Sequence, residues 1–309
     1  MAQPGDGSGP PIIANTFDHC VGPKAGFNTQ AFEMTPGALE ALEREPEDEG
    51  DADAWPEYDD SEDYESTAEA ALDAPALESS VRWPEDADSP EYGHLLTHDR
   101  ALSGTSFEFT VADLELLIAA NAFRPNRTAG RIIFGLRGAM LDGGTNAERA
   151  AQVDRPSLRL KDARPDHHNF RCVIGVYNLA ERTLSGFISS TVPNRYAVNN
   201  YRTRRNSGNI MLTGCYRYIV GGHSKNRYPG CLRQNQRFVV LRSVDNNIYD
   251  QGDIFDPGWQ FDNIHPAFSD RKGGAQFSSY GCQTIRGTCT RGTDRHRGEW
   301  AQFRKALGL

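Results

Sequence analysis

The feature that most constrains the fold of this chain is an acidic segment at residues 40–91. It contains 21 Asp and Glu residues against only Arg44 and Arg82, and Pro, Ala and Ser are interleaved with the charges. Such a composition cannot bury enough apolar surface to offset the conformational entropy lost when the chain becomes ordered. We therefore predict that residues 1–100 form an acidic, largely disordered leader and that the folded domain begins near residue 101.

The remainder of the chain has the opposite charge. Residues 92–309 carry 30 basic and 18 acidic residues, so the overall charge of −9 hides a basic domain of net charge +12. A basic surface attracts nucleic acid, anionic lipid or an anionic wall polymer, and charge alone does not choose between them. No apolar run is long enough for a membrane span. Residues 1–11 have neither a basic start nor an apolar core, so we predict no secretory signal and synthesis in the cytoplasm.

Short β-branched and aromatic runs, separated by Gly-rich and Asn-rich turns, predict a mainly β domain with a few short helices. Helices are expected at 111–123, where Thr110 and Asp113 form a capping box, and at 299–307. The expected strands, of which the second and third would form a hairpin, are 131–136, 171–178, 183–191, 210–212, 215–220 and 237–243.

A histidine and a cysteine in the last third of the chain carry the strongest chemical signal. His265 and Cys282 lie in the stretch 261–287, FDNIHPAFSDRKGGAQFSSYGCQTIRG. A cysteine attacks well only as a thiolate, and histidine, with an ordinary pKa of about 6.5, is suited to accept its proton. Gly281 lets the backbone approach a substrate and direct N–H groups at a developing oxyanion. The pattern predicts acyl transfer at Cys282 with His265 as the base.

This stretch resembles the motif of the L,D-transpeptidase catalytic domain (YkuD-type), in which a histidine is followed, after a spacer, by Ser-His-Gly-Cys. His265 and Cys282 match the base and the nucleophile of that motif, and Ser279 and Gly281 match its serine and glycine. The cysteine follows the histidine along the chain, which is the reverse of the order in papain-like enzymes.

Two positions depart from the family pattern and indicate a divergent branch. Tyr280 stands where the family usually has a second histidine, and Gln283 stands where it often has arginine. The resemblance implies an L,D-transpeptidase-like β-sandwich or barrel, with the cysteine catalytic domain at residues 101–309 and its motif core at 261–287.

The resemblance also implies the substrate and the reaction. Cys282 would attack an L-centred carbonyl of a peptidoglycan stem peptide and expel the terminal D-amino acid through a thioester acyl-enzyme. Transfer to another stem, exchange of the D-amino acid and hydrolysis all remain open. Neither a metal, a cofactor nor nucleic acid is expected. A wall enzyme without an export signal favours an antibacterial effector that acts in the periplasm after non-classical secretion, with secretion machinery and an immunity protein as partners.

Further side chains are candidates for orienting the base or binding substrate. Asp262 or Asn263 could orient the His265 ring through its second nitrogen. Arginines could pair a substrate carboxylate, and Arg217, Arg233 and Arg286 are the candidates. The set of expected orienting and substrate-binding residues is Asn263, Ser279, Tyr280, His223 and Arg286.

Two other functional classes stay open at this point. The domain could be a non-catalytic module that binds wall polymer or another anion, in which case Cys282 would be dispensable. It could also be a zinc-dependent hydrolase, with His265, Cys282, Cys289 and His296 as ligands, although their separations exceed the usual close pairs of zinc sites.

Overall fold

The computed structural model of the chain describes residues 106–143, 150–163, 167, 169–194, 197, 208–224, 226–242, 249, 253–269 and 277–309, and the backbone of 12–18. The predicted disorder of the acidic leader lies outside these residues. Strand β1 (Ile12–Asp18) is the part of the leader range that the structure describes. Its backbone lies in the main sheet. There it runs parallel to the strand that contains Ile133, the partner of Ala14, and antiparallel to the strand that contains Tyr218.

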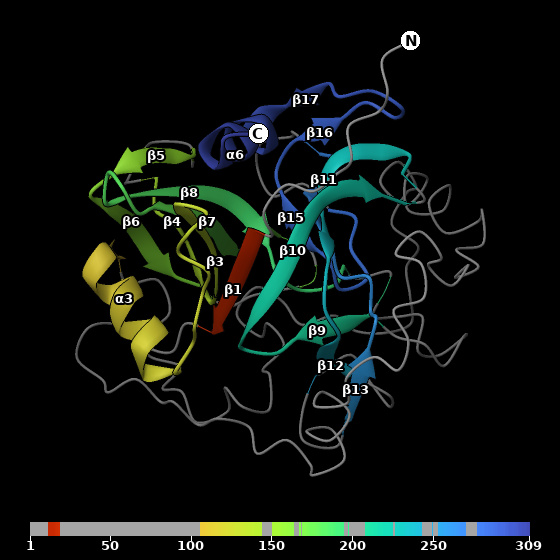
Figure 1. The fold of residues 1–309 in the computed structure, drawn as a ribbon, viewed down its shortest axis with the longest axis horizontal. Coiled ribbons are helices and arrows are strands. Elements are labelled where there is room, and N and C mark those ends of the chain that lie inside the picture. Colours follow the sequence, from red (N-terminus) through yellow and green to blue (C-terminus); the bar gives the residue numbers. More distant parts are fainter. Residues whose placement is uncertain are drawn as a thin grey trace.

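Strands dominate the described residues, so the prediction of a mainly β domain is confirmed (Figure 1). The two helices of this part of the chain are α3 (Val111–Ala120) and α6 (Gly298–Leu307). The strands that follow β1 are β2 (Ser106–Thr110), β3 (Arg131–Arg137), β4 (Ala139–Leu141), β5 (Gln152–Arg155), β6 (Ser157–Asp162), β7 (Cys172–Asn178), β8 (Thr183–Ser190), β9 (Asn209–Met211), β10 (Gly214–His223), β11 (Tyr228–Gln234), β12 (Phe238–Arg242), β13 (Ile254–Gly258), β14 (Ile264–Pro266), β15 (Gln283–Ile285), β16 (Thr288–Cys289) and β17 (His296–Arg297).

A nine-stranded sheet forms the body of the fold, in the order β15-β14-β11-β10-β1-β3-β7-β8-β5. The sheet curls into a half-barrel because β15, at one end of this order, also pairs with β8 near the other end (Figure 1). Two strands share that edge of β8: β5 pairs at Gly186, and β15 pairs at Ser189 and Ser190. Smaller sheets, β13-β12-β9, β2-β6-β4 and β16-β17, complete the fold.

The centre of the main sheet is buried on both faces. Successive side chains of a strand point to opposite faces, and in β3 Ile132 and Phe134 belong to one apolar cluster while Ile133 belongs to the other. The first cluster includes α3 residues such as Leu114, and the second includes Trp300 of α6. Burial on both faces explains why the β3 sequence is almost continuously apolar.

Local sequence signals predicted several elements well. Thr110 Oγ1 accepts the backbone N–H of Asp113 at 3.2 Å, and the Asp113 carboxylate accepts the N–H of Thr110 at 2.8 Å, so the capping box of α3 is confirmed. The helix ends at Ala120, and Asn121 follows it as the C-cap. β7 and β8 form the predicted hairpin, and β3, β9, β10, β12 and α6 occupy the other predicted segments.

A buried ion pair holds α6 against β8. The Glu299 carboxylate accepts a hydrogen bond from Arg286 Nη2 at 2.7 Å and another from the backbone N–H of Ile188 at 2.6 Å. Burial raises the pKa of the Glu299 carboxyl, and the charge of Arg286 opposes that rise. Arg286 was a candidate for binding a substrate carboxylate; the structure pairs it with this internal carboxylate instead.

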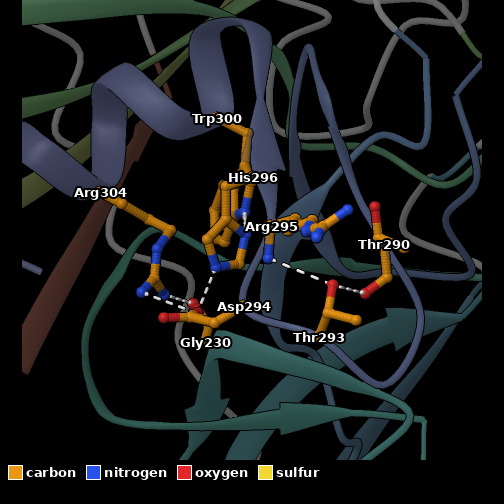
Figure 2. A network of polar contacts seen from close by, with 8 residues as sticks. All are labelled: Gly230, Thr290, Thr293, Asp294, Arg295, His296, Trp300 and Arg304. Atoms are coloured by element: carbon orange, nitrogen blue, oxygen red, sulfur yellow. Dashed lines mark hydrogen bonds and ion pairs between the residues drawn. The ribbon is translucent and has the colours of Figure 1, made fainter.

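A second polar network ties α6 to β11 (Figure 2). Arg304 donates to the carbonyl of Gly230 and lies 3.3 Å from Asp294. Asp294 also lies 2.6 Å from His296 Nε2, and Trp300 Nε1 donates to His296 Nδ1 at 2.9 Å. Both ring nitrogens of His296 are therefore engaged within the C-terminal segment, and Arg304 links that segment to β11.

We predict that Arg286→Met lowers the free energy of unfolding by about 3 to 5 kcal/mol, because Glu299 is left as a buried and uncompensated charge. Urea unfolding at pH 7 measures this. Adding Glu299→Gln to Arg286→Met should recover part of the loss, because the amide still accepts from Ile188 without carrying a charge. Equal losses in the single and double variants would contradict a structural ion pair.

Candidate functional site

The parallel pairing of β14 with β15 brings the predicted base and nucleophile together. His265 is the partner of Thr284, and Cys282 precedes Thr284 by two residues. Residues two apart on an extended chain point to the same side of the sheet, so His265 and Cys282 are diagonal neighbours. One ring nitrogen of His265 and the sulfur of Cys282 lie within 4.8 Å of each other.

Cys282 sits in a tight turn that hydrogen bonds of the Ser279 hydroxyl hold closed. Ser279 Oγ accepts the N–H of Gly281 at 3.1 Å and donates to the carbonyl of Cys282 at 2.8 Å. A Cβ atom at position 281 would collide with Oδ1 of Asn209 and would lie 2.5 Å from Oδ1 of Asp262. Glycine is required here by close approach, and the turn delivers Cys282 with 8 % of its surface exposed.

His265 is buried and carries its proton at a defined atom. Its Nδ1 lies 2.6 Å from the carbonyl oxygen of Pro266, which can only accept, so Nδ1 bears the hydrogen and Nε2 keeps a lone pair. The ring stacks on His223 at 4.1 Å between centroids and lies 5.4 Å from Phe268. Burial lowers the pKa of His265 to about 4. His265 is therefore neutral at pH 7 and has a free position for the thiol proton.

His223, at the end of β10, is the third member of the cluster. The pairing of β10 with β11 shifts register between Gly221 and His223, and such a bulge redirects the side chains that follow it. The half-buried His223 ring contributes a nitrogen within 4.8 Å of the Cys282 sulfur. Burial and the adjacent His265 ring hold the pKa of His223 well below its ordinary value, so it is neutral as well.

One asparagine determines where the proton of His223 lies. Asn263 Oδ1 accepts the backbone N–H of Gln234 at 3.1 Å, so the other end of the amide, Nδ2, is the atom 3.2 Å from His223 Nδ1. Because Nδ2 donates, His223 Nδ1 accepts, and the single hydrogen of the neutral ring is on Nε2. The stacked histidines are therefore opposite tautomers, with a lone pair at Nε2 of His265 and an N–H at Nε2 of His223.

The structure also shows what orients the His265 ring. Asn263 and Asp262 were candidates for holding the His265 ring, but the partner of His265 Nδ1 is the carbonyl of Pro266. Asn263 orients His223 instead. The carbonyl of Phe261 lies 3.5 Å from the Cys282 sulfur, and Phe261 adopts the left-handed conformation with φ of 56°. Backbone carbonyl positions of this kind leave no signal in a sequence.

The remaining candidates take supporting positions. The backbone carbonyl of Tyr280 accepts the N–H of Asn209 at 2.7 Å, which anchors the cysteine turn to β9. The aliphatic part of the Arg233 side chain lies beside Gly221, and Gly221 is on β10, the strand that carries His223. Asn209, which sequence reasoning missed, contacts the turn through both its backbone and its side chain.

Two histidines and a thiol within 4.8 Å are a donor set that zinc accepts. His265 suits a metal, because ligating histidines usually donate their other N–H to a carbonyl. His223 does not: ligation through Nε2 would put its hydrogen on Nδ1, where Asn263 already presents a donor. Metal binding by all three would cost the hydrogen bond between Asn263 and Gln234.

The four residues that the alternative zinc site would use are not brought together among the described residues. Among the described residues, His, Cys, Asp and Glu gather as a possible metal site only at His223, His265 and Cys282. Cys289 pairs with His296 across β16 and β17, and both nitrogens of His296 are engaged as Figure 2 shows.

Comparisons of this chain with protein-family models, curated proteins and solved structures find no match. In the part of the chain that the structure describes, neither helix is long and apolar enough to cross a membrane.

Beneath the turn, Asp262 is a buried carboxyl whose ionisation the fold opposes. Its side chain is 2 % exposed, and burial raises its pKa to about 7, a rise that Arg242 and Asn209 partly oppose. Its Oδ1 lies 3.4 Å from Asn209 Nδ2, and Oδ2 has no hydrogen-bond partner among the described residues. Because the folded pKa exceeds the ordinary value of 3.8, the carboxyl destabilises the fold increasingly as pH rises to about 7.

We predict that Asp262→Asn stabilises the protein at pH 8 by on the order of 3 kcal/mol, because the amide has the same shape and cannot ionise. The gain should grow as pH rises from about 4 to about 7 and then stay constant, following the two pKa values of the carboxyl. Denaturant unfolding at a series of pH values measures it. Glu181→Gln, at an exposed position of the β7–β8 turn, is the control and should show no such gain. A pH-independent effect of Asp262→Asn would refute this account.

Proposed function

We propose that this chain is a peptidoglycan-modifying cysteine enzyme that attacks the stem peptide at an L-centre through an acyl-enzyme, as L,D-transpeptidases do. The observation that carries the proposal is a neutral histidine whose Nε2 keeps a lone pair and which has a ring nitrogen within 4.8 Å of the Cys282 sulfur. The reaction class follows from that pair. The substrate class rests on the resemblance of residues 261–287 to the L,D-transpeptidase motif.

In the first step His265 Nε2 takes the proton of the Cys282 thiol while the sulfur attacks the carbonyl carbon. The carbonyl oxygen gains a negative charge and His265 becomes an imidazolium. The C–N bond then breaks, the imidazolium returns its proton to the departing amine of the D-residue, and a thioester remains. An amine of another stem, a free D-amino acid or water then attacks the thioester, which returns Cys282 to the thiol.

The low pKa of His265 suits the second half of this reaction, in which the amine leaves. A base with a pKa of about 4 takes a thiol proton only as the carbon–sulfur bond forms. Once protonated, however, the same group is a strong acid, and an amine leaves readily only when it receives a proton. Burial of His265 thus favours a neutral resting pair and a rapid return of the proton to the leaving group.

A zinc-dependent hydrolase is the second candidate, and the approach of two histidines and a thiol favours it. The hydrogen bond from Asn263 to His223 opposes it, because that bond requires the wrong tautomer for ligation through Nε2. The two candidates differ in a simple property: the hydrolase needs bound metal and loses activity with a chelator, whereas the thioester route needs neither.

We predict that the purified protein trims or exchanges the terminal D-residue of tetrapeptide stem fragments and forms a thioester adduct, and that Cys282→Ala does neither. Intact-mass spectrometry of protein and substrate records both events. Cys215→Ala, a cysteine of β10, is the matched control and should behave like the unchanged protein. Inert protein that still binds wall polymer would favour the binding module, and activity that a chelator removes would favour the hydrolase.

We predict that kcat/KM keeps about nine-tenths of its plateau at pH 5, because the base titrates near pH 4 in the folded protein. A histidine with the ordinary pKa of about 6.5 would leave only about 3 % of the plateau at that pH. The pH profile with stem peptide distinguishes these values. The same profile in Asp262→Asn isolates the base from the carboxyl that titrates near pH 7. An acid limb near 6.5 in both proteins would exclude a desolvated His265 as the base.

A further inference from the structure

The cysteine turn uses one of its own oxyanion donors internally. The sequence predicts that N–H groups near Gly281 and Cys282 stabilise the oxygen that becomes negative during attack. In the structure the N–H of Gly281 donates to Ser279 Oγ at 3.1 Å. That bond belongs to the contacts that hold the turn closed, so the N–H is committed before a substrate arrives. A donor from elsewhere in the fold would complete the site.

His223 has the position and the tautomer for this task. It lies on β10, its ring stacks on the ring of His265, and one of its nitrogens is within 4.8 Å of the Cys282 sulfur. The oxygen of an attacked carbonyl is attached to the carbon that bonds the sulfur, so this spacing leaves room for a hydrogen bond of about 2.8 Å to that oxygen. The hydrogen bond from Asn263 keeps an N–H at Nε2.

We propose that His223 is a further catalytic residue, a neutral N–H donor to the oxygen that gains charge when Cys282 attacks, and that Asn263 is the positioning residue that keeps its proton on Nε2. This inference rests on the proposed acyl transfer at Cys282. It gives the two stacked histidines separate roles: His265 moves the proton, and His223 stabilises the charge.

The geometry excludes an exchange of these roles. His223 cannot act as the base through Nδ1, because Asn263 Nδ2 occupies that lone pair at 3.2 Å. When His265 takes the thiol proton, its positive charge is 4.1 Å from the His223 ring between centroids. Two like charges at that separation repel strongly in a buried site, so His223 stays neutral throughout the step.

Two thiol reagents distinguish the loss of an oxyanion donor from the loss of a general base. p-Nitrophenyl acetate acylates Cys282 through a tetrahedral oxyanion and releases p-nitrophenolate, whereas iodoacetamide alkylates the same sulfur by displacing iodide, with no oxyanion. Both reactions need the thiol deprotonated, and only acylation needs an oxyanion donor. The ratio of the two rate constants therefore reports the donor alone, and Cys282→Ala supplies the background from other cysteines.

We predict that His223→Phe, which keeps an aromatic ring against His265, lowers the acylation-to-alkylation ratio about 100- to 1,000-fold. His223→Gln keeps an N–H donor and should recover a large part of that ratio. His265→Phe is the contrasting variant, and it should slow both reactions because it removes the base. A ratio that is unchanged in His223→Phe, or two rates that fall equally, would overturn the donor role while leaving Cys282 as the nucleophile.

Asn263→Asp tests the positioning residue through the pH dependence of the same ratio. The carboxylate would accept from Nδ1, so neutral His223 would carry its hydrogen on Nδ1 and lose the donor at Nε2. The negative charge would also raise the pKa of His223, and protonated His223 bears a hydrogen on both nitrogens. Among the described residues, the titratable groups in contact with this ring include His265, Cys282 and Tyr228.

The ratio in Asn263→Asp should therefore be high at acidic pH and fall as pH rises, while the unchanged protein shows no such dependence between pH 5 and pH 8. A flat ratio in the variant would overturn the role of Asn263. If neither reagent modifies Cys282 in the unchanged protein, the proposed function and this inference both fail; if Cys282 reacts and only the ratio disagrees, the proposed function stands and this inference fails.

Discussion

The site depends on one pairing, that of the short parallel strands β14 and β15. β14 follows β11 in the order of the sheet and β15 pairs with β8, so the two strands form the seam at which the half-barrel curls back on itself. His265 stands on one side of the seam, and Cys282 enters the other side from its turn. The histidine and the cysteine become neighbours through the pairing of β14 with β15, and the pairing of β15 with β8 then fixes both strands within the curled sheet.

The second constraint is the burial of the polar groups beside Cys282. Burial lowers the pKa of both histidines and raises that of Asp262, so in each case it opposes the charged form. Where charge is so costly, hydrogen bonds decide which atom carries each proton. A carbonyl at Pro266 and an amide at Asn263 thereby assign opposite tautomers to two rings of the same chemical type.

Elements with a local signal could be predicted from the sequence, and elements defined by distant contacts could not. The capping box at Thr110 and the β7–β8 hairpin are complete within a few residues. β14 and β15 have three residues each, too few for a period to show. The sequence gives no sign that Arg286 has an acidic partner, because only the fold places Glu299 beside it. His265 and Cys282 were singled out because reactive residue types and a glycine occur in one stretch that resembles the L,D-transpeptidase motif.

In the sequence, His223 was only a candidate for orienting the base or binding substrate. Its importance was not visible there because the linear motif places its second histidine elsewhere. The L,D-transpeptidase pattern has a second histidine directly before Gly-Cys, where this chain has Tyr280. In space, an imidazole nevertheless lies against the base, contributed by β10 and held by the residue before β14. If the site needs a second imidazole, then either a neighbour in sequence or a neighbour across the sheet can supply it. A linear motif detects the first arrangement and not the second, so a departure at Tyr280 does not by itself weaken the chemistry proposed for Cys282.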